Sequence, residues 1–170
     1  KIEKAVLFPG ADSAMFQEWM GNFLTHAQDN NATFQAMYTY FDGMDTLSVT
    51  EQIPFSSDRK WSAMTFSGAG TLVIGAPERL SPEKLPESVL EAQQNGKRVL
   101  LAGITQHAVQ KEQPLPEMQL LAEIILTDPL RANAAKTIAA FQQEGVSVKL
   151  ISGDNPMTAS AMAQQAGVFQ

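Results

Sequence analysis

Segment 122–167 constrains the fold most strongly, because apolar runs and helix-like stretches alternate in it with short links. The run 122–127 (AEIILT) lacks clean alternation, which is typical of a strand buried on both faces. A second strand is predicted at 146–151 (VSVKLI), and helices are predicted at 128–145 and 155–167. A strand–helix–strand–helix order predicts a right-handed βαβ unit with a parallel sheet.

The residues before this segment follow a different pattern. Apolar residues recur at helical spacing in 11–28, and a polar break separates this helix from a second one that carries Met37. Residues 58–66 alternate, a Gly-containing turn follows, and 71–75 complete an antiparallel hairpin. A further helix and two further strands are predicted at 86–96, 97–106 and 118–128.

These two patterns predict two domains. Residues 1–120 are expected to form an α+β domain whose antiparallel sheet is flanked by helices. Residues 121–170 are expected to begin an α/β domain with the βαβα segment described above. The apolar and charged fractions, 44% and 18%, are typical of a globular chain.

The composition excludes several classes of function. The chain has no cysteine, which excludes disulfides, thiolate catalysis and cysteine-based metal sites. The net charge of −6 argues against a nucleic-acid or anionic-membrane surface. No apolar run approaches the roughly 20 residues that a membrane span needs, and the start of the chain does not form a signal peptide. Because the first residue is Lys and not Met, we expect a fragment excised from a longer protein.

Polar loops follow both apolar runs of the predicted parallel sheet. Ser152, Gly153 and Asp154 come after the second run, and Asp128 comes after the first. Strand ends in a parallel sheet share one edge, where two carboxylates would suit Mg²⁺ and phosphate chemistry. Arg131 would then clamp a phosphate or carboxylate. The alternative is that both loops only cap helices and that Arg131 is a solvated helix residue.

The cap signals at the second loop are explicit. Asn155 is a typical N-cap residue, and Pro156 is typical of the first helical position. The same signal precedes the first predicted helix, where Asp128 stands before Pro129. The free N–H groups at such a helix start can also hold an anion.

A second group of candidates lies in the antiparallel part. The stretch FSSDRK places Phe55 and Lys60 just before a strand, where they would stack on a base and pair with a phosphate. Gly75 in GAPE would let the backbone approach a ligand, and Arg98 opens a strand beside Lys97. The alternatives are an edge-strand charge cluster and an ordinary Gly–Pro loop.

The order of these motifs is more specific than any one of them. Over roughly residues 50–170 the chain resembles the cytoplasmic catalytic region of P-type cation-transporting ATPases. The motifs that carry this resemblance are FSSDRKWSAMTF, VIGAPE, GKRVLLAG, ILTDPLR and GVSVKLISGDNPMTASAMAQQAGV.

The resemblance implies a nucleotide-binding (N) domain followed by part of a phosphorylation (P) domain of haloacid-dehalogenase-like fold. By motif position, Phe55 would stack on the adenine of ATP, and Lys60 would lie near the adenine and the phosphates. Gly75 and Ala76 would line the adenine pocket. Arg98 would reach the phosphate tail.

The P-domain motifs imply catalytic roles as well. The resemblance assigns Asp128, Arg131, Ser152, Gly153 and Asp154 to the P domain. There they would help to hold the phosphates, the ribose or Mg²⁺ when the two domains close.

Four positions depart from the family pattern. Ile74 stands where the family commonly has Lys before GAPE, and Ser57 stands where several relatives have Arg. Asn31 and Phe34 stand where acidic residues would be expected in the preceding helix. The departures imply a less charged nucleotide site.

The sequence contains neither the Asp-Lys-Thr-Gly-Thr phosphorylation motif nor the later Gly-Asp-Gly-Val-Asn-Asp motif of this family. We therefore expect the nucleophile, the actuator domain and the transmembrane helices to be partners supplied by the rest of the polypeptide. The resemblance implies a cytoplasmic domain of an integral membrane protein that uses ATP and Mg²⁺. Two alternatives stay open, a non-catalytic nucleotide-binding regulatory module and a fragment of a cap-containing phosphatase.

Overall fold

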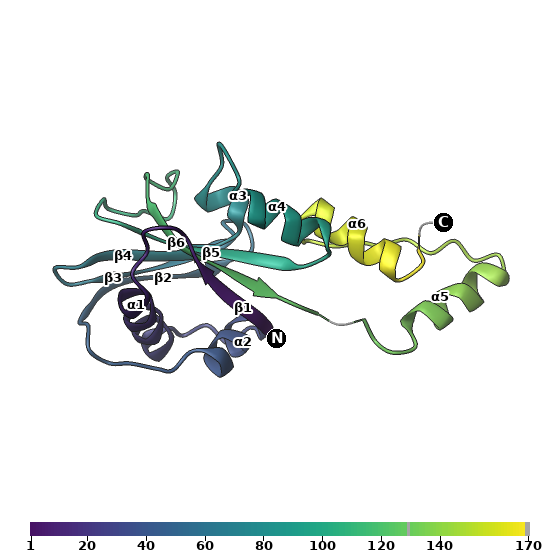
Figure 1. Ribbon diagram of the computed structural model, residues 1–170, viewed down its shortest axis with the longest axis horizontal. Helices are drawn as coiled ribbons and strands as arrows, with labels where there is room; N and C mark the ends of the chain where they lie inside the picture. The colour runs from purple at the N-terminus through teal and green to yellow at the C-terminus, as the bar shows by residue number, and fades with distance from the viewer. Residues whose placement is uncertain (129, 169–170) are drawn as a thin grey trace.

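The computed structural model describes residues 1–128 and 130–168. Its centre is a six-stranded antiparallel sheet in the order β1-β6-β5-β4-β3-β2 (Figure 1). The strands are β1 Ile2–Leu7, β2 Val49–Ser56, β3 Trp61–Phe66, β4 Gly70–Gly75, β5 Arg98–Thr105 and β6 Gln119–Leu126. The helices are α1 Ser13–His26, α2 Ala32–Tyr40, α3 Pro77–Leu80, α4 Glu87–Gln94, α5 Ala134–Gln143 and α6 Pro156–Gln165.

Helices cover both faces of the sheet. On one face, α1 and α2 contribute fully buried side chains such as Phe16 and Met20, which pack with Leu72 of β4. On the other face, α3 and α4 contribute Leu80 and Val89 to a second cluster. Each fully buried large apolar side chain stabilises the fold by about 1.5–3 kcal/mol. The predicted antiparallel sheet flanked by helices is confirmed.

Local signals begin and end several of the helices, but the helix predicted from residue 128 begins only at Ala134, after Asn133, whose side chain forms no cap hydrogen bond. The Asp12 side chain accepts a hydrogen bond of 2.8 Å from the Met15 amide and caps α1. Asn31 caps α2 and Asn155 caps α6 in the same way. Gly96 has φ 74°, the left-handed conformation that ends a helix such as α4.

The predicted parallel strand at 122–127 was wrong in its pairing. These residues belong to β6, which lies antiparallel to β1 on one side and to β5 on the other. The run is apolar without alternation because β6 is central in a sheet that helices cover on both faces. The expected domain boundary between 120 and 121 falls inside this strand.

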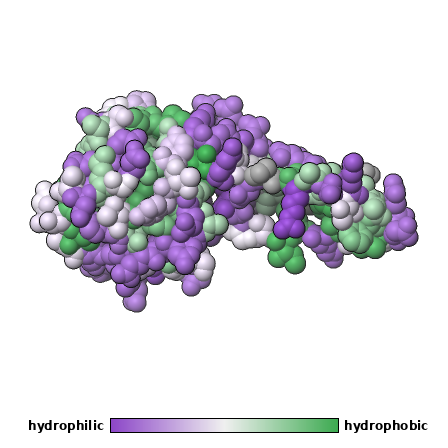
Figure 2. Space-filling view, turned by 90° about the horizontal axis from the view of Figure 1, so that it is seen from below, coloured by the Kyte–Doolittle hydropathy of each residue, from purple (hydrophilic) through white to green (hydrophobic). Residues whose placement is uncertain are grey.

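The predicted strand at 146–151 does not form. A strand needs a neighbour for its backbone hydrogen bonds, and no described strand lies beside this segment. Ile151 is 96% exposed, and none of the described residues of α5 is buried. In Figures 1 and 2, α5 and its flanks form a narrow arm beside the main body, with hydrophobic atoms on its surface. Pro129, part of the predicted cap before this helix, lies outside the described residues.

The end of the chain returns to the main body through α6. The Thr158 hydroxyl donates a hydrogen bond of 3.1 Å to the carbonyl of Lys97, and Gln165 donates one to the carbonyl of Asn95. Helix α6 therefore lies beside α4 (Figure 1). This packing brings the loop at 152–155 to the end of the sheet at which β5 begins.

Candidate functional site

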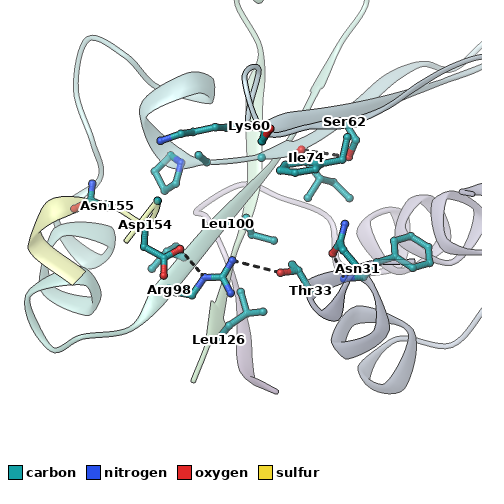
Figure 3. A pocket seen from close by; sticks show the side chains of 18 of the residues that line it. Asn31, Thr33, Lys60, Ser62, Ile74, Arg98, Leu100, Leu126, Asp154 and Asn155 are labelled. Carbon is teal, nitrogen blue, oxygen red and sulfur yellow. Dashed lines mark hydrogen bonds and ion pairs between the residues drawn. The ribbon is translucent and has the colours of Figure 1, made fainter. Parts of the chain in front are cut away.

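A cavity opens at this end of the sheet. Its volume of about 450 Å³ is typical of small-molecule sites. It is bounded by α2, by the adjoining ends of β3 to β6, by α3 and α4, and by the loop before α6 (Figure 3). Segments far apart in the chain therefore share one space.

One side of the cavity is apolar. Phe34 and Met37 of α2 face it, together with Ile74 of β4 and Leu126 of β6, and all four are buried. Phe55 also lines the cavity and is 43% exposed. A flat aromatic group can enter such a space and lose its contact with water.

Arg98 stands at the centre of the polar side. Its guanidinium Nε lies 3.3 Å from Oδ1 of Asp154, and its Nη1 lies 3.3 Å from Oδ2 of Asp128. Its Nη2 donates a hydrogen bond of 3.4 Å to the Thr33 hydroxyl (Figure 3). One side chain of β5 thus joins α2, the end of β6 and the loop before α6.

Lys60 is the second cation of the cavity. Its φ is 60°, and it is the one non-glycine residue with a positive φ in the described part of the chain. The Lys60 amide donates to the Ser56 carbonyl at 2.7 Å, and its carbonyl accepts from the Ala76 amide at 2.9 Å. The Lys60 ammonium lies 3.3 Å from the carboxylate of Glu78. A left-handed residue held by two backbone hydrogen bonds stores strain, which proteins concentrate at functional sites.

No protein-family model matches the chain, but its sequence is similar to those of several curated proteins. The chain is 40% identical to the probable cation-transporting ATPase exp7 of Streptococcus pneumoniae over 148 residues, 86% of this chain and 19% of that protein. It is 35% identical to the calcium-transporting ATPase CtpE of Mycobacterium tuberculosis over 143 residues, 81% of this chain and 18% of that protein.

A solved structure shares the fold of this chain. The crystal structure of a zinc-transporting PIB-type ATPase matches 99% of this chain and 25% of that one, with a TM-score of 0.58 and 19% identity. By its curated relatives, the chain belongs to the P-type cation-transporting ATPases. It spans about a fifth of the length of the curated relatives, 19% and 18%.

The structure brings together most of the residues that the sequence singled out in this P-type ATPase chain. The predicted site residues that line the cavity are Phe55, Lys60, Gly75, Ala76, Arg98, Gly153 and Asp154. Asp128 reaches the same place through its ion pair with Arg98. The carboxylates of Asp128 and Asp154 both contact the guanidinium of Arg98. They do not lie along the edge of a parallel sheet, as the sequence had predicted.

Two predicted residues lie apart from this group. The Ser152 hydroxyl accepts a hydrogen bond of 3.1 Å from the Asp154 amide and so shapes the loop without lining the cavity. Arg131 is exposed and also lies outside the cavity lining. Within the ranges that the structure describes, no cluster of three or more His, Asp or Glu side chains could hold a metal ion, and no helix is long and apolar enough to cross a membrane.

Gly75 has a packing role that the sequence did not reveal. A Cβ at Gly75 would lie 2.5 Å from Cβ of Trp61 and 2.6 Å from the carbonyl oxygen of Lys60. At Gly153, by contrast, a Cβ would meet no atom within 4 Å. The glycine at 75 is therefore required by the β3–β4 pairing, whereas the glycine at 153 leaves open space at the loop.

The departures from the family pattern acquire structural explanations in this P-type ATPase chain. The Asn31 side chain accepts a hydrogen bond of 2.9 Å from the Phe34 amide and caps α2. Phe34 and Ile74 are buried and pack into the cluster beneath α1 and α2. Ser57 lines the cavity but brings no charge. This side of the site is consequently apolar where charged residues were expected.

Thr33, Glu78 and Gln93 are among the cavity residues that sequence reasoning missed. Thr33 and Glu78 gain their roles only by contact with Arg98 and Lys60, which are distant in the chain. Gln93 left a local signal, since it is a polar residue at a position of α4 that shares the buried face.

Proposed function

We propose that this chain is the nucleotide-binding part of a cation-transporting ATPase and that it holds ATP in the cavity described above. The observation that carries the proposal is the joining of an apolar wall and two cations, Arg98 and Lys60, in one space of about 450 Å³. ATP has matching chemistry, because its flat base is largely apolar and its triphosphate is anionic.

In this proposal the base enters between α2 and the sheet and stacks on Phe55. The triphosphate extends toward Arg98, whose planar guanidinium forms charge-assisted hydrogen bonds with phosphate oxygens. Asp128 and Asp154 give up part of their contact with Arg98 as the phosphates replace them. Lys60 adds a second positive charge from the strained turn before β3.

Mg²⁺ is expected to accompany the phosphates, because this ion is bound chiefly through substrate phosphates and one or two carboxylates. Asp128 and Asp154 are the carboxylates that the described residues place beside Arg98. Their oxygen atoms suit this hard cation, which neutralises charge on the transferred phosphoryl group when bound.

Cation transport is proposed for the longer protein. The aspartyl-phosphate would form on an Asp outside this sequence, and its formation and hydrolysis would drive the ion across a membrane. Within the present chain, we propose that the nucleotide-binding domain runs to the end of β6 at Leu126, where backbone hydrogen bonds join Lys1 and Thr127. Residues after 127 would belong to the phosphorylation domain. The relatives reported above are transport ATPases, which favours this proposal over a regulatory module or a phosphatase.

Titration of the 170-residue chain with ATP, followed by NMR and calorimetry, tests nucleotide binding. We expect shifts around Phe55, Lys60 and Arg98, and an affinity about ten-fold lower or worse in Arg98→Gln, because hydrogen bonds to charged groups are worth about 1.5–3 kcal/mol. Lys111→Gln removes the same charge from an exposed loop beyond the far end of β5 and should bind normally. Absence of shifts at these residues at millimolar ATP would contradict the proposal.

A further inference from the structure

Gln93 occupies a core position of α4. The buried residues of this helix are Val89, Ala92 and Gln93, which share one face at helical spacing. Gln93 is only 1% exposed, yet it lines the cavity. Its Oε1 is buried and has no hydrogen-bond partner among the described residues.

An orphaned polar atom of this kind calls for an explanation, because nearly all buried polar side chains in proteins find a partner. Gln93 lines a cavity large enough for a small molecule. The terminal torsion of Gln is broad, so the amide can turn toward a ligand at small cost. A ligand group in the cavity would supply the missing partner.

The residues around Gln93 indicate which chemical group of a ligand could be its partner. Gln93 lies in α4 beside α6, which carries the cavity residue Thr158 and is capped by Asn155. In Figure 3, α6 lies across the cavity from α2. A phosphate oxygen only accepts hydrogen bonds, and Arg98 and Lys60 provide its donors. A hydroxyl both donates and accepts, so it satisfies the Gln93 amide in either of its two orientations. The hydroxyls of ATP are those of its ribose.

We propose that the Gln93 amide forms a hydrogen bond with a ribose hydroxyl of the bound nucleotide and thereby selects ribonucleotides over deoxyribonucleotides. The inference rests on the proposed binding of ATP in this cavity. A nucleotide that lacks the hydroxyl leaves the amide unpaired in the complex, which is how a buried polar group rejects an analogue.

The affinities of ATP, 2′-deoxy-ATP and 3′-deoxy-ATP for the 170-residue chain test this inference by calorimetry. We expect one deoxynucleotide to bind about three- to ten-fold more weakly than ATP, the effect of one lost neutral hydrogen bond. Gln93→Met has nearly the same volume and no amide. It should bind ATP more weakly by a similar factor and bind the deoxynucleotide as well as it binds ATP.

Gln94→Met is the matched control, because Gln94 is exposed on the same helix and does not line the cavity. This variant should discriminate as the unsubstituted chain does. Thermal unfolding separates recognition from packing, since replacing an orphaned amide by an apolar group should leave the melting temperature unchanged or raise it. If Gln93→Met does not fold, Gln93→Leu and the deoxynucleotide comparison on the unsubstituted chain remain decisive.

Equal affinities for ATP and both deoxynucleotides would overturn this inference alone. Discrimination that persists in Gln93→Met would overturn it as well, because another group would then read the ribose. Failure of ATP itself to bind is a different result, which would overturn the proposed function together with this inference.

Discussion

The guanidinium Nε of Arg98 lies 3.3 Å from Oδ1 of Asp154, which joins the first residue of β5 to the loop before α6. Asp128 holds the same guanidinium from the end of β6. In the proposed complex, Arg98 exchanges these two carboxylates, at least in part, for the phosphates of the nucleotide. We therefore expect the carboxylates to set how tightly the cavity binds an anion.

Without Mg²⁺, Asp154→Asn should bind ATP about two- to five-fold more tightly, because a partly exposed ion pair is worth up to about 1 kcal/mol and the charge of Asp154 also repels phosphate. Calorimetry at low and high salt measures the effect, which should shrink as salt screens it. Glu112→Gln removes an equal charge from an exposed loop and should change little. Weaker binding in Asp154→Asn would show that this carboxylate contacts the nucleotide directly.

Lys60→Gly should separate the charge of Lys60 from its backbone strain. A left-handed non-glycine residue costs roughly 1–2 kcal/mol, and this relief offsets the lost pair with Glu78. We expect the free energy of unfolding to stay within about 1 kcal/mol of its original value while ATP binding weakens. Lys60→Ala loses the same charge but keeps the strain, so it should bind ATP equally weakly and unfold at lower denaturant concentration. Equal stability of the two variants would contradict the strain argument.

Gly75→Ala should destabilise the domain by about 1–3 kcal/mol, because the new methyl group would overpack the backbone of β3. Gly153→Ala is the natural comparison, since a Cβ there meets no atom within 4 Å and φ is not positive. It should leave the free energy of unfolding unchanged within about 0.5 kcal/mol. Urea unfolding of the two variants measures the difference. Similar losses in both would mean that the loop at 152–155 packs more tightly than the structure shows.

The ion pair between Glu3 and Lys97 links β1 to the residue before β5. The hydrogen bond from Lys97 lowers the pKa of Glu3, and the charges of Lys97, Lys4 and Lys1 act in the same direction. A carboxyl whose pKa is lowered by folding stabilises the fold above its usual pKa, near 4.3. That stability is lost as the pH falls through the lowered value.

Glu3→Gln should therefore be less stable at pH 7 and should converge with the unsubstituted chain in acid. Urea unfolding at a series of pH values measures this difference. High salt should reduce it, because both side chains are partly exposed. A difference that persisted unchanged below the usual carboxyl range would contradict the assignment to this ion pair.

Local signals allowed the helices to be predicted from the sequence. The cap at Asn155 and the stop at Gly96 depend on neighbours within a few residues, so both could be predicted from the sequence. The caps at Asp12 and Asn31 are equally local. The hairpin of β3 and β4 was equally readable, because its turn is short. The strands β1 and β2 were missed, since only Ile2 is buried in β1 and only Ile53 in β2. Phe55, which was expected just before a strand, lies within β2.

Residue types and motif order determined that this chain has an antiparallel sheet flanked by helices, and they identified Phe55, Lys60 and Arg98 as candidates. Only the tertiary structure decided that β6 pairs with β1 and β5, because an apolar run fits any central strand and its partners lie far away in the chain. It alone brought Asp154 to Arg98 and left the Gln93 oxygen without a partner in the described part of the chain. Ion pairs and buried polar groups depend on distances between segments, and sequence spacing does not contain those distances.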